Sequence, residues 1–201
     1  LENTRYYYKC VQGTTASLIY SFITACNSCT DFRFAWMADC RWDPYYPNSR
    51  TIHDKISLLI RNANPRFSLY GGDLCYIPEY SYWTDDFFRT DEKELISYVP
   101  FINAPGTGSH EAWSQNTKSF TQAFTQAGEQ NGYYSFDYGS MHVLVLNQNE
   151  SFTDQSPQYI FAQNDLQNTN QRWKVVICHE PAYSYGGHGG DLDMQYMTTN
   201  I

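Results

Sequence analysis

FSLYGGDLCY, residues 67–76, is the stretch of this 201-residue sequence that indicates the fold most clearly. Its first four residues are aromatic, small or apolar, a composition typical of a short buried strand. Two glycines end the strand, and Asp73 follows them directly. The stretch is therefore interpreted as a strand that presents a carboxylate at its carboxyl end.

Further segments repeat this organisation. Residues 32–38 alternate apolar and polar side chains and stop at Asp39, and residues 173–178 stop at His179. Another short strand leads into a glycine-rich loop that carries His110. Strands that alternate with helices predict an α/β fold, in which ligands gather at the carboxyl ends of the strands.

Helical patterns lie between these strands. Apolar residues recur at helical spacing within residues 52–60, with Ser49 as the candidate cap and Pro65 after the end. Further helices are predicted at residues 92–99, at residues 120–127, and from Pro157, which Ser156 caps.

Two hairpins complete the pattern. The first joins residues 6–10 to residues 17–24 around a turn at Gly13, and both strands are rich in aromatic and β-branched residues. The second joins residues 133–138 to residues 141–146. The first hairpin is too small to form a domain of its own.

The charge balance excludes some partners. The chain has 13 Lys and Arg against 21 Asp and Glu, a net charge of −8, whereas binding to nucleic acid or to an anionic membrane depends on clustered cations. No apolar run approaches the roughly 18 residues that a membrane span needs. We therefore expect neither a nucleic acid nor a membrane as a partner.

The six cysteines leave alternatives open. Cys26 and Cys29 are spaced as one half of a zinc site, but a local or crossed disulfide fits the same spacing. Asn149 begins a sequon for N-linked glycosylation. An even cysteine count and a sequon together favour a secreted protein that is glycosylated at Asn149.

The polar residues at the strand ends point to metal chemistry. Asp39, Asp73, His110 and His179 are the residue types that ligate zinc, manganese and iron. A carboxylate that bridges two such ions allows them to orient a phosphate ester. The alternative is structural, because an aspartate at a strand end often forms a turn or caps a helix.

The remaining alternatives concern cysteine and tyrosine. Cys40, Cys75 and Cys178 each adjoin one of these residues, and they are either metal-binding thiolates or ordinary buried side chains, which is the commoner case. The 18 tyrosines either fill sheet surfaces or form a surface for self-association.

Four segments carry a family resemblance. In order along the chain, Ala38-Asp39, Gly72-Asp73-Leu74-Cys75-Tyr76, Gly108-Ser109-His110-Glu111 and Val176-Ile177-Cys178-His179 resemble the first four motifs of the calcineurin-like metallophosphoesterases. Tyr76 points to the purple acid phosphatase branch, which uses this tyrosine as an iron ligand.

The resemblance implies a fold and a division into domains. Residues 31–201 would form a four-layer α-β-β-α metallophosphoesterase sandwich whose C-terminal part is missing. Residues 1–25 would be the last strands of a preceding fibronectin-III-like β domain.

The resemblance also implies a dinuclear metal centre. Asp39, Asp73 and Tyr76 would hold iron, while Asp73 and His179 would face a second ion of zinc, manganese or iron. The implied activity is hydrolysis of a phosphate monoester by metal-bound hydroxide. The alternative is a catalytically degenerate phosphoesterase fold that serves as an extracellular binding or self-assembling structural module.

Other residues of the implied pocket include departures from the family pattern. By resemblance, His110 would be an outer-sphere acid or phosphate contact, and His188 a second pocket histidine. Ser109 replaces a metal-binding asparagine, and Arg41 replaces a small glycine of the first motif. The guanidinium of Arg41 would either help to hold substrate or sit on Asp39 in place of a metal, and we favour the second hypothesis.

Overall fold

The computed structural model describes residues 1–111, 131–186 and 199. The first of its two larger sheets has the order β5-β6-β7 and is parallel throughout. Its strands are β5 (Phe34–Met37), β6 (Phe67–Tyr70) and β7 (Phe101–Asn103). All four residues of β6 are buried, because this strand lies at the centre of the sheet and is covered on both faces.

The second sheet has the order β10-β9-β8. Its strands are β8 (Tyr134–Tyr138), β9 (Met141–Val145) and β10 (Trp173–Ile177). β8 and β9 form the predicted antiparallel hairpin around Gly139, and β10 runs parallel to β9. The carboxyl ends of β9 and β10 therefore lie at the same edge of this sheet.

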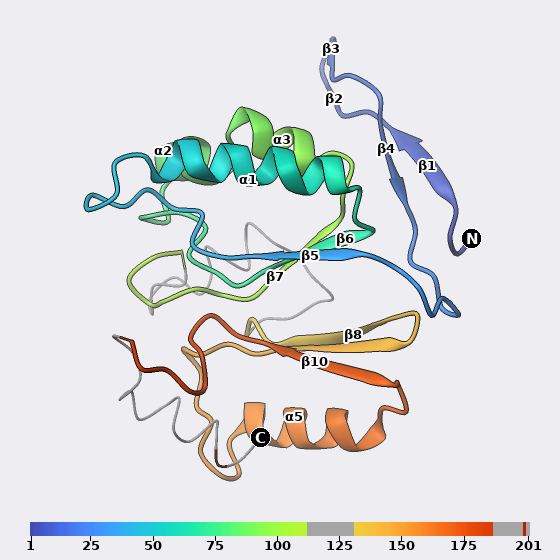
Figure 1. Cartoon of the computed structure of the whole chain (residues 1–201), viewed down its shortest axis with the longest axis vertical. Helices are drawn as coiled ribbons and strands as arrows, with labels where there is room; N and C mark the ends of the chain where they lie inside the picture. Colours follow the sequence, from blue (N-terminus) through green and yellow to red (C-terminus); the bar gives the residue numbers. More distant parts are fainter. Residues whose placement is uncertain (112–130, 187–198, 200–201) are drawn as a thin grey trace.

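Helices lie on the outer sides of the two sheets (Figure 1). α1 (Ser49–Ala63) and α3 (Thr90–Ile96) lie beside the first sheet, and α5 (Pro157–Asn168) lies beside the second. Two short helical turns, α2 (Tyr80–Tyr82) and η1 (Trp83–Phe87), precede α3. Ser156 caps α5 as predicted, since its side chain accepts a hydrogen bond from the backbone N–H of Tyr159.

Apolar side chains pack in three clusters between these elements. One cluster lies between the two sheets and contains Phe67 and Leu69 of β6 with Val143 and Val145 of β9. A second joins the first sheet to η1, and a third joins β9 to α5. The predicted α/β class is confirmed, and the alternation along β6 and β9 sends successive side chains to opposite faces.

α1 differs from its sequence-based interpretation. The side chains of Ile52 and Leu59 on its apolar stripe are exposed, at 53% and 68%, while His53 and Ser57 are buried. The buried side holds the carboxylate of Glu92, which accepts a hydrogen bond from Ser57 at 2.6 Å. The helix therefore packs inward through a polar network and through Ile60, which packs against the core, while Ile52 and Leu59 stay exposed.

The two ends of α1 are set by their surroundings. Asn48, and not Ser49, is the residue at the N-cap, and the Ser49 hydroxyl instead accepts a hydrogen bond from the backbone N–H of Asp43 at 3.1 Å. The predicted cap was therefore wrong by one residue, because the preceding turn uses that hydroxyl. At the other end, Asn64 takes the left-handed conformation directly before Pro65.

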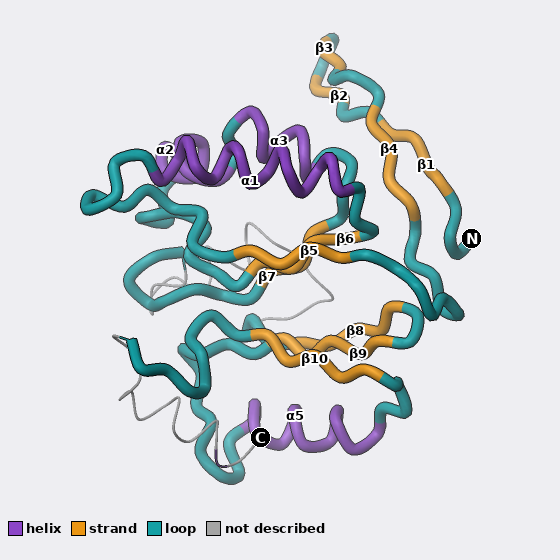
Figure 2. The backbone as a smooth tube through the Cα atoms, in the orientation of Figure 1, coloured by secondary structure: helices purple, strands orange, loops and turns teal. Residues whose placement is uncertain are grey.

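The opening hairpin is interrupted (Figure 2). β1 (Arg5–Tyr8) pairs with β4 (Tyr20–Ile23), and a separate short ladder joins β2 (Val11–Gln12) to β3 (Thr15–Ala16). Gly13 turns the tip at φ +59°, as the predicted turn requires. β1 and β4 are thus shorter than the two predicted strands, and the β2–β3 ladder lies between the predicted ranges.

A disulfide joins Cys26 to Cys29 after this hairpin. The structural-zinc alternative for this pair is therefore wrong, since both sulfurs are used in the bond. The disulfide loop also contacts the β8–β9 turn, where the backbone N–H of Gly139 donates to the carbonyl of Cys26 at 2.7 Å.

Within the described residues, no helix has both the length and the apolar character that crossing a bilayer requires.

A histidine cluster connects the second sheet to α5. His142 places its two ring nitrogens 2.7 Å from a carboxylate oxygen of Asp137 and 2.6 Å from one of Asp165. Desolvation lowers the pKa of His142, but the hydrogen bonds to Asp137 and Asp165 outweigh it, so the pKa is raised above its ordinary value of 6.5. The folded protein therefore favours the protonated ring.

The His142→Gln substitution is expected to cost more stability at low pH than at high pH. The folded-state pKa of His142 is raised, so its contribution is fully present below pH 6.5 and is lost as the pH rises through the folded value. Urea unfolding of both proteins at several pH values measures the difference in unfolding free energy. A difference that grows as the pH rises would contradict this assignment.

Candidate metal centre

Two equivalent turns carry the two aspartates. Asp39 follows β5 with φ 56°, and Asp73 follows β6 with φ 54°. This left-handed conformation is rare outside glycine, and aspartate is among the residues that tolerate it best. The backbone N–H of Asp39 donates to the carbonyl of Gly72 at 3.0 Å, so the two turns hold each other in place at one edge of the parallel sheet.

His179 follows β10 and comes from the other sheet. Together, Asp39, Asp73 and His179 each offer a ligand atom, and these atoms all lie within 4.8 Å of one another. The Nδ1 atom of His179 lies 2.6 Å from the carbonyl oxygen of Gly71. A carbonyl can only accept, so Nδ1 carries the proton and the lone pair of Nε2 faces Asp73, whose Oδ1 is 3.5 Å away.

This donor set fits a metal ion. Two carboxylates and a neutral imidazole are suited to zinc, manganese or iron(II). The hydrogen bond from His179 to Gly71 orients the ring for ligation, as outer-shell carbonyls commonly do in metal sites. Within the described part of the chain, no other group of three or more His, Cys, Asp or Glu residues meets the same criterion.

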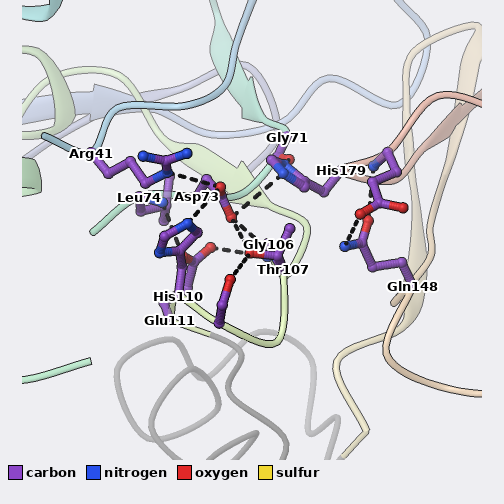
Figure 3. Close-up of polar contacts among 12 residues, drawn as sticks. Arg41, Gly71, Asp73, Leu74, Gly106, Thr107, His110, Glu111, Gln148 and His179 are labelled. Carbon is purple, nitrogen blue, oxygen red and sulfur yellow. Dashed lines mark hydrogen bonds and ion pairs between the residues drawn. The ribbon is translucent and has the colours of Figure 1, made fainter. Parts of the chain in front are cut away.

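Each oxygen of the Asp73 carboxylate has its own partners (Figure 3). Oδ1 accepts hydrogen bonds from the backbone N–H and the hydroxyl of Thr107, at 2.8 Å and 3.2 Å. Oδ2 accepts from Nε of Arg41 at 3.0 Å and lies 3.5 Å from Nε2 of His110. Asp73 therefore lies at the centre of the site.

These partners set the ionisation of Asp73. Its side chain is only 3% exposed, and desolvation alone would raise its pKa. Electrostatic interactions with the rings of His179 and His110, together with the hydrogen bonds from the Thr107 N–H and from Arg41, outweigh desolvation, so the pKa is lowered below its ordinary value. The carboxylate is ionised throughout the physiological pH range and is available to a cation.

Glu111 stabilises the loops around Asp73, a role that the sequence motifs did not indicate. Its buried carboxyl group accepts hydrogen bonds from the backbone N–H groups of Gly106, at 2.9 Å, and Leu74, at 3.1 Å. Burial, followed by repulsion from Asp73, raises the pKa of Glu111 to about 8. An acidic residue next to His110 in a glycine-rich loop was the available signal, because such loops expose backbone donors.

Two further predicted residues contact the neighbours of Asp73, His110 and Thr107. The ring of Tyr76 packs 5.4 Å from the ring of His110, between centroids, and its backbone carbonyl is 2.7 Å from Nδ1 of that histidine. Ser109 is exposed, and its hydroxyl lies 3.1 Å from the hydroxyl of Thr107. His188 lies outside the described residues.

Arg41 does enter the site, but with a different partner from the one expected. We expected its guanidinium on Asp39, whereas Nε donates to Oδ2 of Asp73. The backbone explains the difference, because the N–H of Arg41 donates to the carbonyl of Asp73 at 3.1 Å and so places the side chain beside the second turn. The prediction that Arg41 modifies the site is retained, with the partner corrected.

The three cysteines beside the motifs, Cys40, Cys75 and Cys178, are structural side chains rather than metal-binding thiolates. Cys40 and Cys75 are fully buried in the cluster between the first sheet and η1. Burial raises the pKa of all three thiols, in the case of Cys178 to about 11. They are therefore protonated at neutral pH, and none joins the group formed by Asp39, Asp73 and His179.

Comparison with known proteins identifies one group of relatives. The chain is 28% identical over 194 residues to purple acid phosphatase 21 of Arabidopsis thaliana, an alignment that covers 90% of the chain and 42% of the relative. It is 23% identical over 230 residues to probable inactive purple acid phosphatase 9 of the same plant, covering 91% and 35%. The chain thus spans less than half the length of these relatives. No protein-family model matches it.

A solved structure shows the same fold. Purple acid phosphatase PPD1 from yellow lupin (Lupinus luteus) seeds superposes with a TM-score of 0.75 over 93% of the chain and 38% of the lupin chain, at 20% sequence identity. The resemblance to purple acid phosphatases expected from the four motifs is confirmed in sequence by these relatives and in fold by the lupin structure.

Proposed function

We propose that the protein is a metal-dependent hydrolase of phosphate monoesters. The observation that supports this proposal is the convergence of Asp39, Asp73 and His179 from the strand ends of two sheets, beside the cationic side chain of Arg41. An ion held there would supply Lewis acidity toward a phosphoryl oxygen and would activate the attacking water. The names of the relatives support the same class of reaction.

The side chains around the ion would hold and orient the substrate. Nδ1 of His110 donates to the carbonyl of Tyr76, so Nε2 faces Oδ2 of Asp73 and the centre of the site. From this position His110 would contact a phosphate oxygen or, when protonated, donate a proton to the leaving group. Arg41 adds a permanent positive charge beside it.

The rest of the predicted organisation forms part of this proposal. The sandwich is inferred to be the four-layer metallophosphoesterase arrangement, with residues 1–25 as the end of a fibronectin-III-like domain. A secreted location is inferred with it, which the Cys26–Cys29 disulfide supports. Glycosylation of Asn149 stays a prediction; its side-chain nitrogen donates to the carbonyl of Gly106 at 2.9 Å.

Metal removal tests the proposal. Chelator-treated protein is expected to lose hydrolysis of para-nitrophenyl phosphate by at least ~100-fold, and added manganese, zinc or iron(II) is expected to restore it. The Asp39→Asn variant should not be restored, while Asp31→Asn, which changes an exposed carboxylate, should behave as wild type. Full activity without metal would contradict the proposed chemistry.

A second candidate function is a self-associating module on a phosphoesterase fold. Its support is a set of exposed apolar side chains on the first sheet and on α1: Trp36 on the edge strand β5 is 49% exposed, and Ile52 and Leu59 on α1 are 53% and 68% exposed. Concentration-dependent association in sedimentation experiments, combined with no hydrolysis at any metal, would favour this candidate over the enzyme.

A further inference from the structure

The two oxygens of Asp73 face different cationic groups. Oδ1 lies 3.5 Å from Nε2 of His179, and Asp39, Asp73 and His179 form the group of possible metal ligands. Oδ2 is already paired with the guanidinium of Arg41 at 3.0 Å. A carboxylate placed to bridge two cations therefore has one of its two sides taken by a cation that the chain itself provides.

The guanidinium is held from several directions. Besides Asp73, its Nη1 donates to the carbonyl of Trp42 at 3.4 Å and lies 3.6 Å from a carboxylate oxygen of Asp43. Its central carbon lies 5.9 Å from the centre of the Tyr76 ring, within the range of a cation–π contact. The side chain is 20% exposed, so it is a built part of the site rather than a solvated surface charge.

The local charge matters for the substrate. Asp39 and Asp73 carry two negative charges, which one divalent ion neutralises, and Arg41 balances the further carboxylate of Asp43 beside it. Arginine stays protonated at any pH at which the protein folds, and its planar fork suits phosphate oxygens. Among the described residues, its Nη2 makes no hydrogen bond.

We propose that this centre binds a single divalent cation, on Asp39, Oδ1 of Asp73 and His179, and that Arg41 takes the place of a second ion and binds phosphate. This assignment rests on the proposed function, because it describes the same site. It replaces the dinuclear centre that the sequence motifs predict with one metal ion and one guanidinium.

The metal stoichiometry of the full-length protein tests the assignment. Titration of the metal-free protein with manganese, followed by calorimetry and electron paramagnetic resonance, is expected to show one ion per chain with the spectrum of an isolated ion. The Arg41→Met variant, which removes the charge without adding a ligand, is expected to bind that ion about tenfold more tightly, because the competing cation is gone.

The phosphate affinity of the Arg41→Met variant is expected to change in the opposite direction from its manganese affinity. Inorganic phosphate is expected to bind the manganese-loaded Arg41→Met protein about tenfold more weakly than wild type, and Arg41→Lys should retain most of the affinity. Arg61→Met serves as a matched control, since the partner of Arg61 is Glu94 of α3, and both side chains are partly exposed. It is expected to change neither affinity.

Each outcome has a separate meaning. Two manganese ions in the wild type, or a spectrum of two coupled ions, would overturn the role of Arg41 and leave the proposed hydrolase intact. Unchanged manganese and phosphate affinities in Arg41→Met would overturn it as well. No ion in any of the proteins would overturn the proposed function itself. If Arg41→Met does not fold, the wild-type stoichiometry and the Arg41→Lys variant still decide the question.

Discussion

Replacing Asp73 with asparagine is expected to weaken metal binding at the candidate centre by at least ~100-fold and to reduce phosphate-monoester hydrolysis by at least as much. The substitution keeps the shape of the side chain, and the amide oxygen can still accept the N–H of Thr107. It removes the one carboxylate that faces His179 on one side and Arg41 on the other. Arg41 then lacks its buried counter-charge.

Manganese titration and the hydrolysis assay measure this effect. Near-UV circular dichroism at the same concentrations establishes whether the variant is folded. Asp31→Asn is the control, because Asp31 is exposed and the charge change is identical. A folded Asp73→Asn protein with wild-type manganese affinity would show that Asp73 is not a ligand, and the proposed site would be wrong.

The Gly106→Ala substitution is expected to have the largest effect on folding. A Cβ atom at this position would lie 2.3 Å from the backbone nitrogen of Asp73 and 2.6 Å from a carboxyl oxygen of Glu111. Neither can move away easily, because the first is main chain in a strained turn and the second is buried and hydrogen-bonded. Overpacking of this kind costs about 3 kcal/mol or more.

Urea unfolding measures that cost, and Gly108→Ala is the matched control. Gly108 lies two residues further along the same loop, where a Cβ atom would meet only a side-chain oxygen of Asn149 at 3.2 Å. The control should fall within about 1 kcal/mol of wild type. Equal losses in the two variants would show that the close approach of the loop to Asp73 is not what requires glycine at 106.

The sequence predicted much of the fold because the relevant signals are local. The strand before Asp73, the hairpin at Gly139 and the cap at Ser156 each depend on residues that are neighbours in the chain. Parallel strands also bring their carboxyl ends to one edge, which is why the strand pattern alone was enough to place Asp39 and Asp73 together.

Other features depend on contacts that the sequence does not encode locally. The periodicity of α1 identified its apolar residues, but not that Ile52 and Leu59 stay exposed while His53 and Ser57 turn toward Glu92. Glu92 lies 35 positions beyond Ser57. The buried Glu111 was missed for the same reason, since its backbone partners include Leu74, 37 residues away.

The sequence by itself determined the α/β class, the resemblance to purple acid phosphatases, and the strand-end positions of Asp39, Asp73 and His179. Only the tertiary structure decided which charged groups pair with one another at the site. It placed Arg41 on Asp73 and not on Asp39, because a backbone hydrogen bond between the two turns sets the direction of the side chain. Periodicity and motif order report which residues reach a site, whereas the pairing of charges within it depends on distances of a few ångströms between segments far apart in the chain.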